Sequence, residues 1–212
     1  MKAPNRRLER QPELLKDTLL SHGVPVTKTL DLTDFENRDM ALEGTGSLIL
    51  DRVHEVAFAI ESPRADREPF MKFCKEMGYY PLFFHAVDKQ GKPIYHTNVM
   101  LSIGEKFAAV CEDAIPKNEV IFVKKSLRDL EKNIIPVTMD QMVKYGANIL
   151  ELKGSKGPII IASETAVNSY TREQLYAFER YGELISFHIP VIETIGGGSA
   201  RCILAEAFPG SI

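Results

Sequence analysis

Four residues whose types can carry covalent chemistry stand at the openings of a recurring sequence pattern: Glu43, His96, Asn148 and Cys202. A thiol attacks carbon at neutral pH only when its pKa is lowered or a base lies nearby. His96 can take and return that proton, and a carboxylate such as Glu43 can orient the imidazole and stabilise its protonated form. The four residue types together predict a covalent catalytic site in which Cys202 is the nucleophile.

Each of these residues also has a purely structural interpretation. A cysteine in an apolar run is commonly a core residue, and this is the interpretation we expect for Cys74 and Cys111. The glycine-rich stretch 196–200 could cradle a phosphate, but the Lys and Ser/Thr of a P-loop are absent. Four other histidines lie at the ends of expected helices or strands and show no partner pattern: His22, His54, His85 and His188.

The recurring pattern predicts units that each hold a β-hairpin, a helix and a further strand. Apolar runs bounded by glycines and charged turns are typical of hairpins, and apolar residues at helical spacing follow them. The unit starts at Glu43, His96, Gly146 and Gly198 are 53, 50 and 52 residues apart. Coincidence among apolar strands is the alternative explanation.

The expected elements are as follows. Hairpins are expected at 46–63, 98–111 and 148–163, with a fourth opening at 198–208. Helices are expected at 67–77, 119–133 and 171–181, the last with a capping box from Thr171 to Gln174. Third strands are expected within 79–88, 134–139 and 184–193.

A helix over residues 12–22 and a strand over 24–32 precede the first hairpin, without a hairpin of their own. The chain is therefore expected to be one domain, residues 1–212, that starts in the middle of a unit. Uncovered strand edges favour self-association, so a homodimer is a possible assembly.

Composition excludes several classes of protein. The net charge of −3 gives no electrostatic basis for binding nucleic acid or an acidic membrane surface. No apolar stretch reaches the roughly 18 residues that span a bilayer, and the first residues lack the apolar core of a signal peptide, so we expect a cytoplasmic protein. The three cysteines do not have zinc-site spacing.

Four motifs resemble those of the amidinotransferase superfamily, the penteins: LEGTGSLILDR from Leu42, GKPIYHTNVMLSIG from Gly91, GANILELKG from Gly146 and GGGSARCILAEAF from Gly196. Within it, the chain looks most similar to the branch of citrulline-utilization hydrolases and amidinotransferases. The resemblance covers nearly the whole chain. It implies an α/β fold, the pentein-type pseudo-fivefold α/β propeller, in which the first blade of this chain would be incomplete.

The resemblance also implies a mechanism. Cys202 would attack the central carbon of a guanidinium or ureido group. His96 would protonate the departing nitrogen and later activate water, and Glu43 would pair with that histidine. No metal or other cofactor would take part, and the partner would be a small guanidino or ureido amino acid.

Five further residues are expected to bind this substrate. Gly197, Gly198 and Ser199 form the loop before the cysteine, and Arg64 lies where relatives carry an arginine suited to gripping a carboxylate; a surface ion pair is the alternative for Arg64. Asn98 stands where many arginine-processing relatives carry Asp. Because an amide can donate to a neutral carbonyl oxygen, Asn98 would favour a ureido substrate such as citrulline; a local turn contact is the alternative.

Three functions remain open from the sequence. The leading one is a cytoplasmic hydrolase of C–N bonds in citrulline or arginine that works through a covalent Cys202 adduct. The second is an amidinotransferase that passes the amidino group to an amine. The third is an inactive truncated pentein with a binding or structural role, which the unit missing at the N-terminus would favour.

Overall fold

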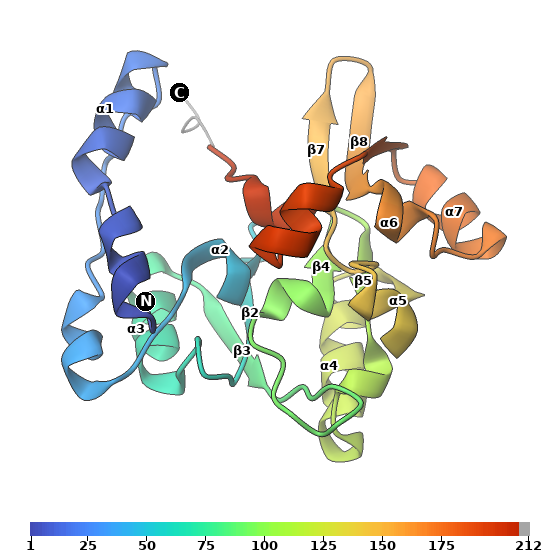
Figure 1. The fold of residues 1–212 in the computed structure, drawn as a ribbon, viewed down its shortest axis with the longest axis horizontal. Helices are drawn as coiled ribbons and strands as arrows, with labels where there is room; N and C mark the ends of the chain where they lie inside the picture. Colours follow the sequence, from blue (N-terminus) through green and yellow to red (C-terminus); the bar gives the residue numbers. More distant parts are fainter. Residues whose placement is uncertain (208–212) are drawn as a thin grey trace.

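The computed structural model describes residues 1–207 and shows an α/β protein built from three small sheets (Figure 1). Each sheet has three strands whose spatial order follows the chain. The first holds β1 (Ile49–Asp51), β2 (Val56–Ile60) and β3 (Tyr80–Phe84); the second holds β4 (Leu101–Ile103), β5 (Phe107–Val110) and β6 (Asn133–Pro136); the third holds β7 (Leu150–Gly154), β8 (Gly157–Ser163) and β9 (Glu183–Phe187).

In every sheet the first two strands pair antiparallel and the third pairs parallel to the second. A parallel pair needs a crossover connection. The helices α3 (Arg67–Met77), α4 (Lys117–Asp129) and α7 (Arg172–Glu179) supply it in the three units. The predicted order of hairpin, helix and strand is therefore confirmed for three units, while the pseudo-fivefold propeller stays a prediction.

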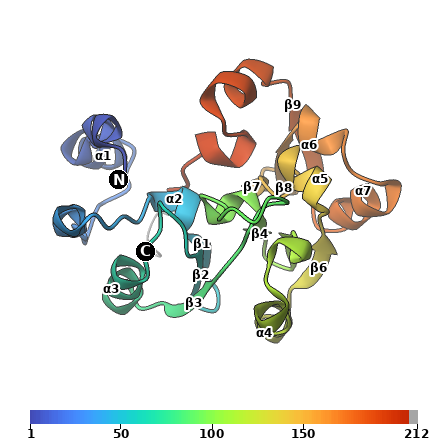
Figure 2. The same ribbon diagram turned by 60° about the horizontal axis from the view of Figure 1, so that its bottom comes forward.

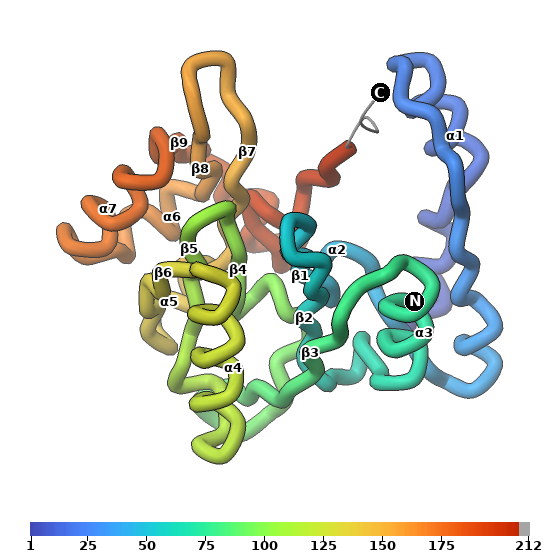
Figure 3. The backbone as a smooth tube through the Cα atoms, turned by 180° about the vertical axis from the view of Figure 1, so that it is seen from behind, coloured from blue at the N-terminus to red at the C-terminus, as the bar shows by residue number. Residues whose placement is uncertain are grey.

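The three sheets follow one another round the body of the molecule, with α3, α4 and α7 at its periphery (Figures 2 and 3). Central strands β2 and β5 are buried along their whole length. One apolar cluster joins all three units and includes Phe58, Phe107 and Ile160. A smaller cluster packs Phe70 and Cys74 of α3 against the first sheet.

Local sequence signals explain several helix ends. The capping box of α7 is present as predicted, with Thr171 and Gln174 bonded to each other's backbone N–H groups. A second capping box, at Thr138 and Gln141, opens the short helix α5 (Met139–Val143). Helix α3 ends at Gly78, whose φ of 78° is the left-handed conformation that glycine adopts readily.

Buried polar contacts join neighbouring units. The Thr97 hydroxyl accepts from the backbone N–H of Ile60 at 3.0 Å and donates to the carbonyl of Ser47 at 2.6 Å. Lys132, which follows α4, forms a buried ion pair of 2.9 Å with Asp51 at the end of β1. The Thr97 contacts fix the entrance of the second unit, where His96 stands, against the first, and the ion pair joins the two units a second time.

The N-terminal segment, residues 1–40, lies along one side of the body (Figures 1 and 3). It contains the 3-10 helix η1 (Pro4–Glu9), the helix α1 (Pro12–Ser21) and the 3-10 helix η2 (Thr33–Arg38). The helix predicted at 12–22 is confirmed. The strand predicted at 24–32 is wrong: residues 24–32 carry no strand, because no strand in the described part of the chain lies beside them to complete a ladder.

The fourth hairpin predicted from Gly198 is also wrong, because residues 198–207 contain no strand. The last residue of that prediction, Phe208, lies outside the described residues. The segment instead forms a 3-10 helix, η6 (Ala200–Ile203), and a π-helical turn, η5 (Ile192–Gly196), lies just before it. The preceding strand β9 ends at Phe187, short of the predicted 193, and Pro190 beyond it lacks the N–H that a ladder needs. Within residues 1–207, none of the helices combines the length and apolar character needed to traverse a bilayer.

Candidate active site

A cavity of about 1740 Å³ separates the N-terminal segment from the body. Its wall brings together seven of the eight residues that the sequence assigned to the site: Glu43, Arg64, His96, Asn98, Gly197, Gly198 and Cys202. Ser199 is placed differently. It is fully buried, it does not line this cavity, and its hydroxyl donates to Glu193 at 2.6 Å.

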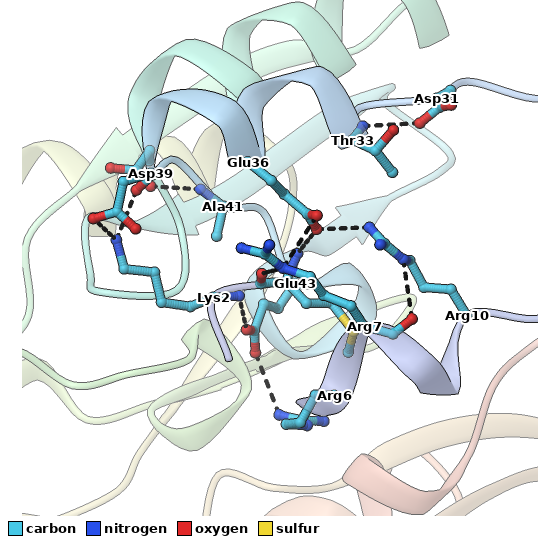
Figure 4. Close-up of polar contacts among 12 residues, drawn as sticks. Lys2, Arg6, Arg7, Arg10, Asp31, Thr33, Glu36, Asp39, Ala41 and Glu43 are labelled. Atoms are coloured by element: carbon cyan, nitrogen blue, oxygen red, sulfur yellow. Dashed lines mark hydrogen bonds and ion pairs between the residues drawn. The ribbon is translucent and has the colours of Figure 1, made fainter. Parts of the chain in front are cut away.

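Glu43 lies at the N-cap of the short helix α2 (Gly44–Ser47) and is buried. One carboxylate oxygen accepts from the backbone N–H of Lys2 at 2.8 Å; the other lies 3.1 Å from His96 Nε2 and 3.4 Å from a guanidinium nitrogen of Arg6 (Figure 4 shows Lys2 and Arg6). Burial would raise the pKa of Glu43, but the hydrogen bonds from Lys2 and His96 outweigh it and hold the pKa below its ordinary value. Glu43 is therefore a carboxylate at neutral pH.

His96 stands where the chain enters the second unit, immediately before the 3-10 helix η3 (Thr97–Val99). Its ring packs against the backbone of Gly46, where an added Cβ would come within 2.6 Å of Nδ1. Burial lowers the pKa of His96, although the Glu43 carboxylate opposes that effect. With Nε2 facing Glu43, Nδ1 is the nitrogen left to exchange a proton with another group.

Cys202 is the one exposed thiol among the three cysteines of the chain. Side-chain amide groups of Asn148 and Asn98 lie 3.2 and 3.4 Å from its sulfur and are oriented to donate to it. Burial raises the pKa of Cys74 and Cys111 to about 11, so neither is a nucleophile at neutral pH. His96 and Cys202 both line the cavity, and among residues 1–207 no hydrogen bond joins them.

Two asparagines organise the thiol. The sequence grouped Asn148 with Glu43, His96 and Cys202 by its place at the opening of the third unit, but gave a specific role only to Asn98. Asn148 donates to the carbonyl of Asn98 at 2.9 Å and accepts from the backbone N–H of Arg201 at 3.1 Å. It thereby links the thiol segment to the second unit.

The Asn98 side chain is almost fully buried, and its Oδ1 has no hydrogen-bond partner in the structure. Its Nδ2 already faces the Cys202 sulfur. A buried acceptor without a donor is costly, so this side chain is held in place at a cost in stability. The local turn contact considered as the alternative is not what the structure shows for this side chain.

Arg64 directs its guanidinium along the cavity wall. It lies over the Tyr95 ring, 5.0 Å from the centroid, and 3.8 Å from Glu43. The sequence gave no sign of Tyr95, Lys2 and Arg6 at the site, because their placement depends on tertiary packing. Residues 1–207 contain no group of three or more His, Cys, Asp or Glu side chains arranged to hold a metal ion.

The family model described as "N,N dimethylarginine dimethylhydrolase, eukaryotic" matches residues 1–209. The chain belongs to this family. The match, together with the solved structures below, places this dimethylarginine dimethylhydrolase family member in the pentein superfamily, as the sequence motifs predicted. The family model does not name the citrulline-utilization branch that the motifs most resembled.

Solved structures show the same fold at low sequence identity. The arginine dihydrolase ArgZ from cyanobacteria is 15% identical with a TM-score of 0.65, over 92% of this chain and 28% of that chain. AgrE in complex with L-arginine is 14% identical with a TM-score of 0.66, over 89% and 26%. SxtG, an amidinotransferase from Microseira wollei, is 12% identical with a TM-score of 0.53, over 79% and 45%.

A curated protein, the SEC14 cytosolic factor of Candida glabrata, is 26% identical over 104 residues, which is 49% of this chain and 33% of that protein. The chain thus spans about a third of the length of this curated relative and less than a third of the ArgZ chain. Because the SEC14 likeness is low and covers under half of the chain, it does not show a second family.

Proposed function

We propose that this family member is a hydrolase that cleaves a C–N bond in the guanidino or ureido group of a small amino acid, through a covalent adduct on Cys202. The observation that carries the proposal is one cavity that holds an exposed thiol and, separate from it, a buried histidine–carboxylate pair. The family's name and the arginine-binding neighbours support the substrate class.

The first step is attack by the Cys202 sulfur on the central carbon of the substrate. The side-chain amides of Asn98 and Asn148 donate toward the sulfur and so hold it in place at the cavity wall. The new C–S bond pushes electrons onto a substrate nitrogen. That nitrogen must gain a proton before the C–N bond breaks.

His96 is the group that supplies this proton, from the other side of the substrate. Its imidazolium is stabilised by Glu43, with which Nε2 makes its 3.1 Å contact. After the amine leaves, the neutral imidazole takes a proton from water. The resulting hydroxide attacks the adduct, and the thiolate departs.

Asn98 lines the cavity with its side-chain N–H directed to the thiol, and we keep it as a substrate-contacting residue. An amide that donates to a neutral carbonyl oxygen would favour a ureido substrate, and the product assay below tests that preference. Arg64, half-buried on the same wall, is suited to the substrate's α-carboxylate.

The test is to incubate the protein separately with arginine, dimethylarginine and citrulline, and to measure released ammonia, alkylamine and amino-acid products. We expect turnover of at least one substrate and a loss of about 10³-fold or more in Cys202→Ala, since removal of a nucleophile leaves only binding and electrostatic effects. Arrest of a mass adduct on Cys202 in His96→Gln would identify the intermediate. Turnover that survives in Cys202→Ala would refute the mechanism.

Transfer of the amidino group is the second candidate, and the likeness to an amidinotransferase structure favours testing it. Water and an amine attack the same adduct, so only the products distinguish the two reactions. A new guanidino compound that forms only when an amine is added would indicate transfer. Absence of any product and of any adduct would leave a binding role.

A further inference from the structure

Glu193 is a buried carboxylate close to the nucleophile that the proposed mechanism does not use. It lies in the π-helical turn η5, directly before the glycines that lead to Cys202. One oxygen accepts from the Ser199 hydroxyl and the other from the Thr165 hydroxyl, both at 2.6 Å. Its side chain therefore ties the two ends of the glycine-rich loop to each other and to α6 (Glu164–Val167), which follows β8.

Two tyrosine hydroxyls hold the same loop through its backbone. Tyr145 donates to the carbonyl of Glu193 and Tyr95 donates to the carbonyl of Gly197, both at 3.0 Å. Tyr95 directly precedes His96, and Tyr145 directly precedes the third unit. The loop is thus anchored from both units that supply the other groups of the site.

The loop needs such anchors because its sequence does not fix its conformation. Glycines 196–198 lack Cβ atoms and have the largest conformational freedom in the unfolded chain. Gly197 adopts a φ of 67°. In the folded loop, an added Cβ on Gly198 would come within 2.9 Å of the Cys202 Cβ, so the loop packs directly on the nucleophile.

The anchored loop in turn sets the thiol. The backbone N–H of Cys202 donates to the Ser199 carbonyl at 3.0 Å. The next N–H back, that of Arg201, donates to Asn148, the residue that also contacts the sulfur. A shift of Ser199 would therefore move Cys202 away from both asparagine amides.

The ionised form of Glu193 suits this role. A carboxylate only accepts hydrogen bonds, and Ser199 and Thr165 both donate to it. Burial would raise the pKa of Glu193, but hydrogen bonds from Ser163, Ser199 and Thr165 outweigh it and keep the pKa below its ordinary value.

We infer that Glu193 is a positioning residue: its carboxylate holds Ser199 and Thr165 together, fixes the loop from Gly196 to Ser199, and thereby sets the place of the Cys202 sulfur. The inference rests on Cys202 being the nucleophile of the proposed function. The structure of the loop can nevertheless be measured without turnover.

The experiment compares Glu193→Gln with Glu164→Gln, a change of the same chemistry on α6 at an exposed carboxylate paired with His188. Hydrogen exchange by mass spectrometry reports the peptides from 194 to 207, and iodoacetamide alkylation reports the Cys202 thiol. In Glu193→Gln we expect at least about tenfold faster exchange in that segment, since hydrogen bonds to a charged acceptor are stronger than those to a neutral amide. Exchange in β2 and β5 should not change.

The alkylation rate of Cys202 should also change in Glu193→Gln and not in Glu164→Gln. Where turnover is found, kcat should fall by about 10–100-fold with a smaller change in KM, because misplacement of about 1 Å costs about that much. Thr165→Val and Ser199→Ala each remove one hydroxyl and should give smaller changes in the same direction, which keeps the test decisive if Glu193→Gln does not fold.

The inference is overturned if exchange in 194–207 and alkylation stay at the original rates in all three variants. It is also overturned if β2 and β5 loosen as much as the loop, because Glu193 would then serve general stability. If no substrate turns over in the unmodified protein, the proposed function fails, while exchange and alkylation still decide the role of Glu193.

Discussion

No residue between 1 and 40 is buried, whereas strands β2 and β5 of the body are buried along their whole length. The two regions face each other across the cavity. The body is held by an apolar core that all three units share. Burial of that kind is cooperative, and each large side chain contributes several kcal/mol.

The N-terminal segment is attached through charges instead. Arg38 reaches Glu68 on α3 at 2.8 Å, Lys28 reaches Glu76 at 3.5 Å, and Arg6 reaches Glu43. The first two pairs lie at the surface, where such pairs are worth about 0–1 kcal/mol each and are screened by salt. In the third pair only Arg6 is solvent-accessible, since Glu43 is buried. The comparison teaches that the two walls of the candidate site are held differently. The wall formed by the body is rigid, and the wall formed by residues 1–40 is weakly held, although both contact the carboxylate of Glu43.

The largest expected difference between the regions is in stability. Phe107 on β5 is fully buried and packs edge-to-face on Phe178 at 5.8 Å between ring centroids, whereas Leu15 on α1 is 60% exposed. Phe107→Ala should lower the free energy of unfolding by about 3–5 kcal/mol, and Leu15→Ala should change it by less than about 0.5 kcal/mol. Urea denaturation followed by circular dichroism measures both. Equal losses would show that α1 is part of the folded core.

The next prediction concerns Gly46, which packs against His96 in the body of the molecule. Its substitution should lower activity while leaving stability nearly unchanged. In Gly46→Ala the added Cβ would lie 2.6 Å from Nδ1 and 2.9 Å from Cε1 of His96, so the ring must shift from its position. We expect kcat/KM to fall by about 100-fold, because a displacement of about 1 Å has that effect. The urea midpoint should change little, since alanine favours the helix α2 in which residue 46 lies. An unchanged kcat/KM would contradict the role assigned to His96.

The body of the fold could be predicted from the sequence because its signals are local and repeated. Alternating apolar runs gave the hairpins, and the spacing of Phe70, Phe73 and Cys74 gave α3. The equivalence of Glu43 and His96 across the repeat placed them in one cavity with Cys202, which a single motif could not have done.

The two failures share a physical cause. Residues 24–32 and 198–207 have apolar residues at strand-like spacing, yet neither forms a strand. A strand needs a partner for its backbone groups, and partners are long-range features that a local pattern does not contain. For the same reason the sequence could not show that Ser199 turns toward Glu193, or that Arg6 reaches Glu43.

The smallest expected effect concerns the charge that the N-terminal segment brings to the histidine. Arg6 is one of the cations that lower the pKa of His96, after burial and together with Arg64. Arg6→Gln should therefore raise that pKa, because it removes one of the positive charges that disfavour the imidazolium. Arg7→Gln is the matched control, since Arg7 pairs with Glu36 at 3.2 Å instead. Titration of the imidazole C–H signal by NMR measures both.

The same variant should alter stability in a defined pH window. The folded pKa of His96 lies below its unfolded value near 6.5, so the unfolded chain binds the proton first as the pH falls. His96 therefore costs stability progressively below about pH 6.5, until the pH passes its folded pKa. Arg6→Gln brings the folded pKa of His96 closer to the unfolded value. The unfolding free energy of this variant should therefore fall less between pH 7 and pH 5.5 than that of Arg7→Gln. An identical slope in both variants would show that the weakly held wall has no electrostatic influence on the rigid one.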